Sequence, residues 1–140
     1  MKLMPLLLAS ALMVPAVCDA LTMSTDQFNT FADVAAYNSA NVTPCLGMPN
    51  VDGDNLIRTS AKLRRRVIAR AAALGYDEAH VARIFDAKEK ASTLLVGDGK
   101  VTYSHLASLS DAGIVKEVRD QERTCARLPR DLSDSLDAFR

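Results

Sequence analysis

Tryptophan is absent from this 140-residue sequence, aromatic residues make up only 5% of it, and there are just two histidines. Strands draw on aromatic and β-branched side chains, whereas Ala, Leu and Arg, which are frequent here, are good helix formers. Two histidines are too few for a typical zinc site if the cysteines are paired. The composition therefore favours packed helices, and we expect no metal and no other cofactor.

An excess of charge of one sign is also missing. Lys and Arg together number 17, Asp and Glu together number 17, and the formal net charge is zero. A neutral molecule has no overall attraction for a polyanion. We therefore do not expect a nucleic-acid partner.

Long apolar runs are missing after the first 20 residues. The run from Leu6 to Val14 is too short for a bilayer, which takes roughly 20 apolar residues. It follows the cationic Lys2 and precedes small residues, which is the pattern of a cleavable export signal. Cleavage after Ala20 is our prediction, with cleavage after Ala16 as the alternative. We therefore expect a signal peptide over 1–20, one domain over 21–140, and a periplasmic or secreted protein.

Loss of Cys18 with the signal leaves two cysteines, Cys45 and Cys125. An even count in an oxidising compartment favours a disulfide. This bond would close a loop of about 80 residues, for which the chain-entropy model gives roughly 4.5 kcal/mol of stabilisation. The alternative of two redox-active thiols lacks the Cys-x-x-Cys spacing that lowers a thiol pKa.

Caps and apolar spacing predict three helices in the first two thirds of the mature chain. Ser24 or Thr25 caps the first, which ends between 38 and 41, with apolar positions at Phe28, Phe31, Ala32, Val34 and Ala35. A loop over 41–53 follows. Asp54 or Asn55 caps a second helix that runs to about Leu74, where Gly75 ends it. Asp77 caps a third helix, which we expect to form an antiparallel hairpin with the second. Six residues indicate the inward side of this third helix: Val81, Ile84, Phe85, Lys88, Leu94 and Leu95.

The last third is less regular. Residues 97–100 form a turn by composition, and from Ser104 the apolar positions fit one long helix or two, with Gly113 as the expected break. Pro129 is expected to end this helix, since proline removes a backbone donor. A last short helical turn then falls in 131–139. The fold class is therefore all-α: a four- or five-helix bundle in a single domain with one long-range disulfide.

Motifs for catalysis or ligand binding are incomplete. Residues 98–105 resemble half of an EF-hand loop, but His105 stands where the closing Glu is needed. Asn50, Asp52 and Asp54 have suitable spacing without the turn glycine or the closing acid. We assign no catalytic residue and no metal ligand. An enzyme or small-ligand carrier with a site between helices, involving His80, His105 or Tyr103, remains the alternative.

One basic face stands out in the second predicted helix. Residues 58–70 contain six cations and no acid. At 100° per residue, five of them share an arc of about 140° opposite the apolar stripe: Arg58, Lys62, Arg65, Arg66 and Arg70. This arrangement predicts an exposed surface for an anionic partner.

Two interpretations of this face stay open. It either binds a partner or pairs internally with the acidic segment 21–54, which holds Asp26, Asp33, Asp52 and Asp54 and no base. On the first interpretation we expect a non-enzymatic interaction protein of the cell envelope, such as an accessory subunit, inhibitor, immunity factor or chaperone. An acidic protein is the expected partner, and an anionic lipid surface is a weaker alternative. The sequence does not indicate an oligomeric state.

Overall fold

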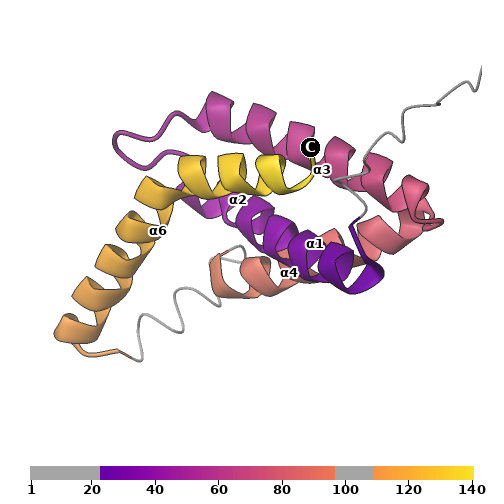
Figure 1. The fold of residues 1–140 in the computed structure, drawn as a ribbon. Helices are drawn as coiled ribbons and strands as arrows, with labels where there is room; N and C mark the ends of the chain where they lie inside the picture. The colour runs from indigo at the N-terminus through magenta and orange to yellow at the C-terminus, as the bar shows by residue number, and fades with distance from the viewer. Residues whose placement is uncertain (1–22, 97–108) are drawn as a thin grey trace, which may run out of the picture.

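The computed structural model describes residues 23–96 and 109–140, and within them it is all-helical with no strand (Figure 1). The helices are α1 (Thr25–Ala40), α2 (Val42–Cys45), α3 (Gly53–Ala73), α4 (Glu78–Val96) and α6 (Asp111–Ala138). The prediction of an all-α helical bundle is confirmed. The predicted turn at 97–100 and the predicted helix start near Ser104 lie outside the described residues.

Helix α1 begins where its caps predict. The Ser24 hydroxyl accepts from the Gln27 backbone N–H at 3.2 Å, and the Gln27 side chain accepts from the Ser24 N–H at 3.0 Å. This reciprocal capping box satisfies two backbone donors that a helix start leaves unpaired. Phe28 is fully buried, but Phe31 and Val34 are 39% and 49% exposed. The core therefore contacts a narrower stripe of α1 than its full set of apolar positions.

Helix α3 begins two or three residues earlier than predicted, since Asp54 or Asn55 was the expected cap. The Asp52 carboxylate accepts from the Asn55 N–H at 3.0 Å and is the N-cap, so Gly53 already belongs to the helix. The other end matches the prediction. Gly75 has φ +82°, and the N–H of Tyr76 reaches back to the Ala71 carbonyl at 2.9 Å. A residue in the left-handed conformation ends the helix, and glycine adopts this conformation without the steric cost that a Cβ atom brings.

Helix α4 starts at the predicted cap. The Asp77 carboxylate accepts from the His80 N–H at 2.8 Å. Val81 and Phe85 are buried one turn apart on its inner side, as the apolar spacing predicts. Lys88, predicted to face inward with them, is half-exposed and forms an ion pair with Asp33 of α1.

Two predictions about helix α6 are wrong. Gly113 does not break it but lies in its first turn, where its N–H donates to the Ser110 hydroxyl at 3.2 Å. Pro129 lies inside the helix, and the predicted short helix over 131–139 is its continuation. An internal proline removes one helical hydrogen bond and bends the axis, and Figure 1 shows α6 changing direction along its length. Buried Leu128 and Leu132 flank the proline and offset its cost.

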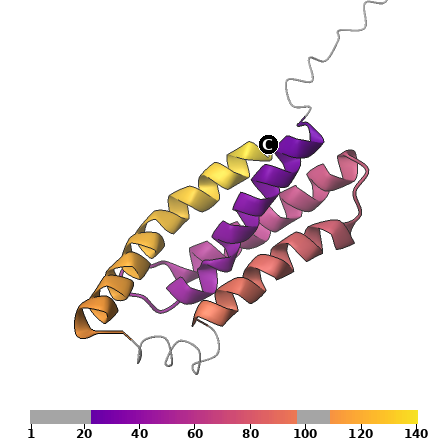
Figure 2. The same ribbon diagram turned by 90° about the horizontal axis from the view of Figure 1, so that it is seen from below.

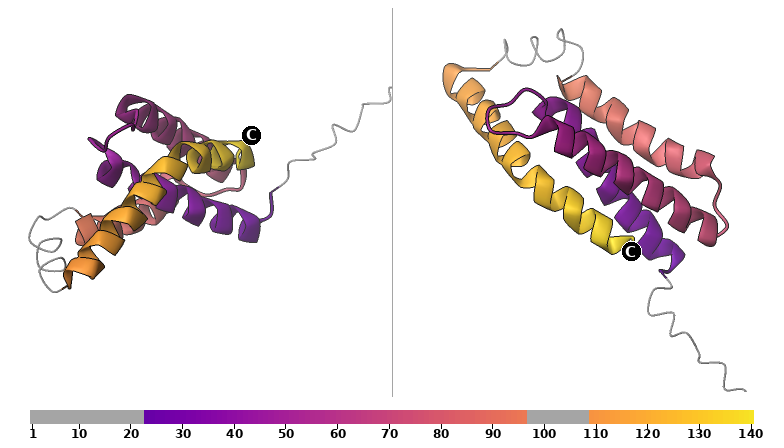
Figure 3. Two further views of the ribbon diagram at one scale, coloured as in Figure 1. Left: turned by 90° about the vertical axis from the view of Figure 1, so that its left-hand side faces the viewer. Right: turned by 90° about the horizontal axis from the view of Figure 1, so that it is seen from above.

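The four long helices alternate in direction. Asp33 and Phe28 of α1 contact Lys88 and His80 of α4, so these two helices run parallel. Phe28, near the N-terminal end of α1, packs against Phe139 at the C-terminal end of α6. Helix α6 therefore runs antiparallel to α1. Figures 2 and 3 show α1 and α3 at the centre, with α4 and α6 on either side.

The core lies where α1, α3, α4 and α6 meet, and its largest fully buried side chains include Phe28, Leu63 and Leu132. At one end of it Cys45 and Cys125 form the predicted disulfide, with a Cα–Cα distance of 5.4 Å. The bond ties α2 to the middle of α6. Among the described helices, none combines the length and apolar character needed to cross a membrane.

Candidate interaction surface

The predicted basic face of α3 divides into two groups. Arg66 and Arg70 are half-buried and reach α6: Arg66 Nη1 donates to the Leu136 carbonyl at 3.0 Å, and Arg70 donates to the carbonyl of Arg140. The last carbonyls of a helix lack partners within it, and its C-terminal end favours positive charge. These two arginines therefore stabilise the end of α6, a role that the sequence pattern did not indicate.

The other three cations form what we call the basic ridge: Arg58, Lys62 and Arg65. All three are exposed. Within the described residues, no ion pair or side-chain hydrogen bond involves any of them. The ridge follows the outer surface of α3, opposite the buried stripe of Leu63 and Val67.

The acidic segment does not pair with the ridge in the described structure. Asp33 lies 3.1 Å from Lys88 of α4, and Asp52 caps α3. Asp26 and Asp54 are in the first turns of α1 and α3, where a helix N-terminus favours negative charge. Each of the four carboxylates expected to neutralise the basic face therefore has a local role elsewhere.

A cleft borders the ridge. Its lining comes from four helices: Ala36, Ser39 and Ala40 of α1, Val42 and Thr43 of α2, Ile57, Ser60, Ala61 and Arg64 of α3, and Phe85 and Glu89 of α4. Its volume is about 260 Å³, and Ile57 at its edge is 50% exposed. The sequence analysis missed this cleft, because only the packed helices bring these small side chains together.

One cation belongs to the cleft and not to the ridge. The Arg64 guanidinium lies 5.2 Å from the centre of the Phe85 ring, in cation–π range, and 3.8 Å from an Asp86 carboxylate oxygen. Arg64 is thereby held against α4. Ser39 also lines the cleft, and its Oγ is buried with no hydrogen-bond partner among the described residues.

Two larger hollows lie along α6. One, of about 530 Å³, is formed by residues 48–52 together with Glu122, Cys125, Ala126 and Pro129. The other, of about 540 Å³, lies against residues 111–123 of α6 alone. Both contain charged side chains but no histidine. Both volumes lie within the roughly 300–1,000 Å³ of small-molecule pockets. The alternative of an enzyme or small-ligand carrier therefore remains a prediction.

Of the three residues named for that alternative, only His80 is among the described residues. His80 stacks on Tyr76 with ring centres 4.1 Å apart, and its Nε2 lies 3.5 Å from the Asn29 side-chain oxygen. Tyr103 and His105 lie outside the described residues. No group of three or more His, Cys, Asp or Glu in 23–96 and 109–140 could hold a metal ion.

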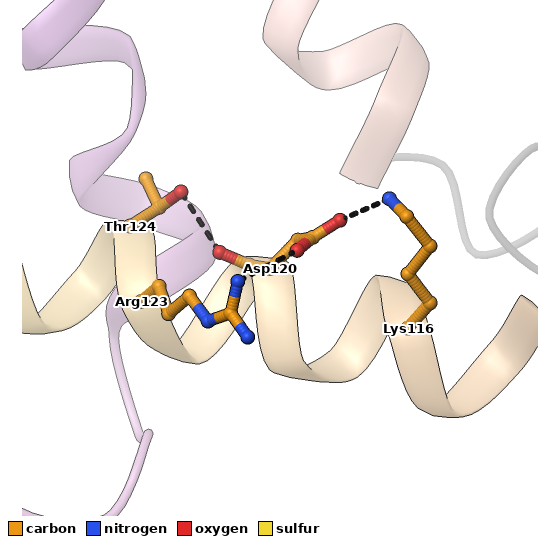
Figure 4. Close-up of polar contacts among 4 residues, drawn as sticks. All are labelled: Lys116, Asp120, Arg123 and Thr124. Carbon is orange, nitrogen blue, oxygen red and sulfur yellow. Dashed lines mark hydrogen bonds and ion pairs between the residues drawn. The ribbon is translucent and has the colours of Figure 1, made fainter.

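Two titratable groups with shifted pKa values, Lys116 and Asp120, form a solvated pair on α6 (Figure 4). Lys116 Nζ donates to Asp120 at 2.6 Å, and Arg123 lies 3.8 Å from the same carboxylate. The hydrogen bond from Lys116 lowers the pKa of Asp120, and the same bond raises the pKa of Lys116. Both shifts favour the charged forms, so this pair is not poised for proton transfer near neutral pH.

No protein-family model matches this sequence, and comparisons with curated proteins and with solved structures found no match.

Proposed function

We propose that this chain is an exported, non-enzymatic interaction protein of the cell envelope that binds an acidic protein through the basic ridge. The observation that carries the proposal is the set of three exposed cations, Arg58, Lys62 and Arg65, which have no acidic partner in the described structure. Like charges four residues apart on a helix destabilise it by roughly 0.2–0.5 kcal/mol per pair. A ridge that keeps this cost without internal compensation is better explained by an external anion.

The division of the basic face reduces the proposed binding residues from five to the three of the ridge. Arg66 and Arg70 already bond to carbonyl groups at the end of α6, so their loss would affect folding as well as binding. Within the basic face, the three ridge cations have no such bonds among the described residues. Inhibition, accessory assembly, immunity and chaperoning all fit such a surface, and the chemistry they share is recognition of carboxylates by Arg and Lys.

A protein fits the ridge better than a lipid or a nucleic acid does. Single-stranded nucleic acid needs stacking aromatics along a basic groove, and α3 carries no aromatic residue. Insertion into a lipid surface needs a broad apolar face beside the cations, whereas the exposed neighbours of the ridge on α3 include Ala61, Ala69 and Ala72. We propose the periplasm or the extracellular space as the location, on the strength of the predicted signal over 1–20.

Charge reversal with a matched control tests the proposal. The ridge variant carries Arg58→Glu, Lys62→Glu and Arg65→Glu. The control carries Arg83→Glu, Arg119→Glu and Arg127→Glu, three exposed cations elsewhere that have no bonded partner in the described structure. Both variants change the net charge by the same amount, and circular dichroism checks that both fold.

Each protein is exported in its native cells, crosslinked in place, and analysed by mass spectrometry. We expect a specific crosslinked partner for the wild type and the control, and its loss for the ridge variant. Equal crosslinking by all three proteins would refute the role of the ridge.

A further inference from the structure

We propose that the cleft between α1, α2, α3 and α4 receives a bulky aliphatic side chain of the same acidic partner. The partner's binding segment would then be amphipathic, with carboxylates on the ridge and an apolar anchor in the cleft. This inference rests on the proposed function, and it adds the class of sequence that the surface recognises.

The positions of ridge and cleft on α3 support a single ligand. Ile57, Ala61 and Arg64 line the cleft, and each is followed one residue later by a ridge cation. At 100° per residue, Arg65 lies about 40° and Arg58 about 60° around the helix from Ala61. The cations therefore form one rim of the cleft. A segment that lies along this rim contacts both surfaces.

The cleft has the size and lining of a side-chain site. Its volume of about 260 Å³ is below the roughly 300–1,000 Å³ of pockets that enclose small-molecule ligands. Three alanines and the Phe85 ring supply apolar walls, and the half-exposed Ile57 gains contacts if the space is filled. Burial of one large apolar residue in a pocket is a common source of affinity at protein interfaces.

The polar groups of the cleft favour a peptide over a lipid headgroup. The lining holds one acid, Glu89, and one cation, Arg64, which already contacts Phe85 and Asp86. The cleft therefore offers no excess positive charge to a phosphate or carboxylate, and the anionic groups of a ligand belong on the ridge.

The test uses a phage library of random 16-residue peptides, selected on the exported, disulfide-bonded protein. Ala61→Phe places a ring at the mouth of the cleft. Ala72→Phe makes the same change at another exposed alanine of α3, one that lines none of the hollows described above, and serves as the control. Fluorescence anisotropy gives the Kd of each selected peptide for the wild type, both single variants and the ridge variant.

We expect selected peptides to combine several acids with a large aliphatic residue. Their affinity should fall about tenfold with Ala61→Phe, which corresponds to the loss of one buried aliphatic side chain, and stay unchanged with Ala72→Phe. Replacing the aliphatic residue of the peptide with Ala should give the same loss in the wild type and no further loss in Ala61→Phe.

Three results would overturn the inference in distinguishable ways. Acidic peptides that bind Ala61→Phe as tightly as wild type would rule out the cleft as the anchor site and retain the ridge as the binding site for carboxylates. Failure to select acidic peptides, together with binding to vesicles containing phosphatidylglycerol, would assign the ridge to a lipid surface and refute both proposals. Concentration-dependent self-association lost in the ridge variant would make a second copy of the chain the occupant and refute an external partner.

Discussion

The two halves of α6 belong to one continuous helix yet differ in what they contact. In residues 111–122 no side chain is buried, and Val115 and Val118 are 49% and 48% exposed. From Cys125 onward a buried residue recurs every three or four positions, through Leu128 and Leu132 to Phe139. The disulfide lies at the junction between the halves. Apolar spacing along a helix therefore does not by itself show which part of the helix is packed.

The physical reason is that the hydrogen bonds described from α1 and α3 to α6 fall in its second half. Asn38 of α1 donates to the Asp131 carbonyl and to the Ser135 hydroxyl, and Arg66 of α3 bonds to the Leu136 carbonyl. The contacts described for the first half are mainly local, as between Lys116 and Asp120. Stability should therefore depend strongly on the second half and weakly on the first.

The largest effect is expected at the junction. Replacing both Cys45 and Cys125 with Ala should lower the free energy of unfolding by about 4 kcal/mol, because the bond closes an 80-residue loop. Urea unfolding followed by circular dichroism measures this loss. A loss below about 1 kcal/mol would mean that packing alone holds α6 on the bundle.

Truncating one buried and one exposed side chain of α6 should show that its two halves contribute differently to stability. Leu132→Ala should cost about 3 kcal/mol, because Leu132 is fully buried and its loss leaves a cavity. Val118→Ala should stay within about 0.5 kcal/mol of wild type. Urea midpoints of the two variants provide the comparison, and equal losses would show that the first half of α6 is packed in solution.

A smaller effect is expected where α1 binds the second half. Asn38→Ala should cost about 1–2 kcal/mol, since it removes two hydrogen bonds and leaves the buried Ser135 hydroxyl without this partner. Asn29→Ala, at an exposed position of the same helix, is the control. It removes the long 3.5 Å contact with His80 at the surface and should change stability by less than about 0.5 kcal/mol. Similar losses in both variants would contradict a specific role for Asn38.

The smallest effect concerns the solvated pair on the first half. The pKa of Asp120 is lowered, so its contribution is present above the usual carboxyl value of about 4 and is lost as pH falls through the shifted pKa. The pKa of Lys116 is raised, so its contribution is present below about 10.4 and is lost as pH rises through the shifted pKa.

The melting temperature of Asp120→Asn relative to wild type should therefore differ most between about pH 5 and 9. The difference should shrink at both extremes, and at high salt, because both groups are exposed to solvent. A difference that grows below pH 3 would contradict the assigned pKa directions.

Local signals were sufficient for much of the fold. Ser24, Asp77 and Gly75 mark helix ends through hydrogen bonds or backbone geometry that involve only neighbouring residues, and the structure confirms each of them. The pairing of Cys45 with Cys125 followed from there being two cysteines in the predicted mature chain. These features need no knowledge of how the helices pack.

Other features depended on tertiary packing and were missed. Pro129 stays within α6 because buried leucines on both sides hold the helix against the core, which overrides the local cost of proline. Arg66 and Arg70 could not be separated from the ridge by sequence, since their partners are 70 residues away. The cleft beside the ridge was invisible for the same reason.

The Cys45–Cys125 bond also changes what a single proteolytic cut can do. A cut anywhere between the two cysteines opens the covalent loop but leaves both fragments joined through sulfur. The nicked molecule would run as one band on a non-reducing gel and as two after reduction. Damage within those 80 residues thus leaves one covalently linked particle, which matters for a protein proposed to work among the proteases outside the cytoplasm.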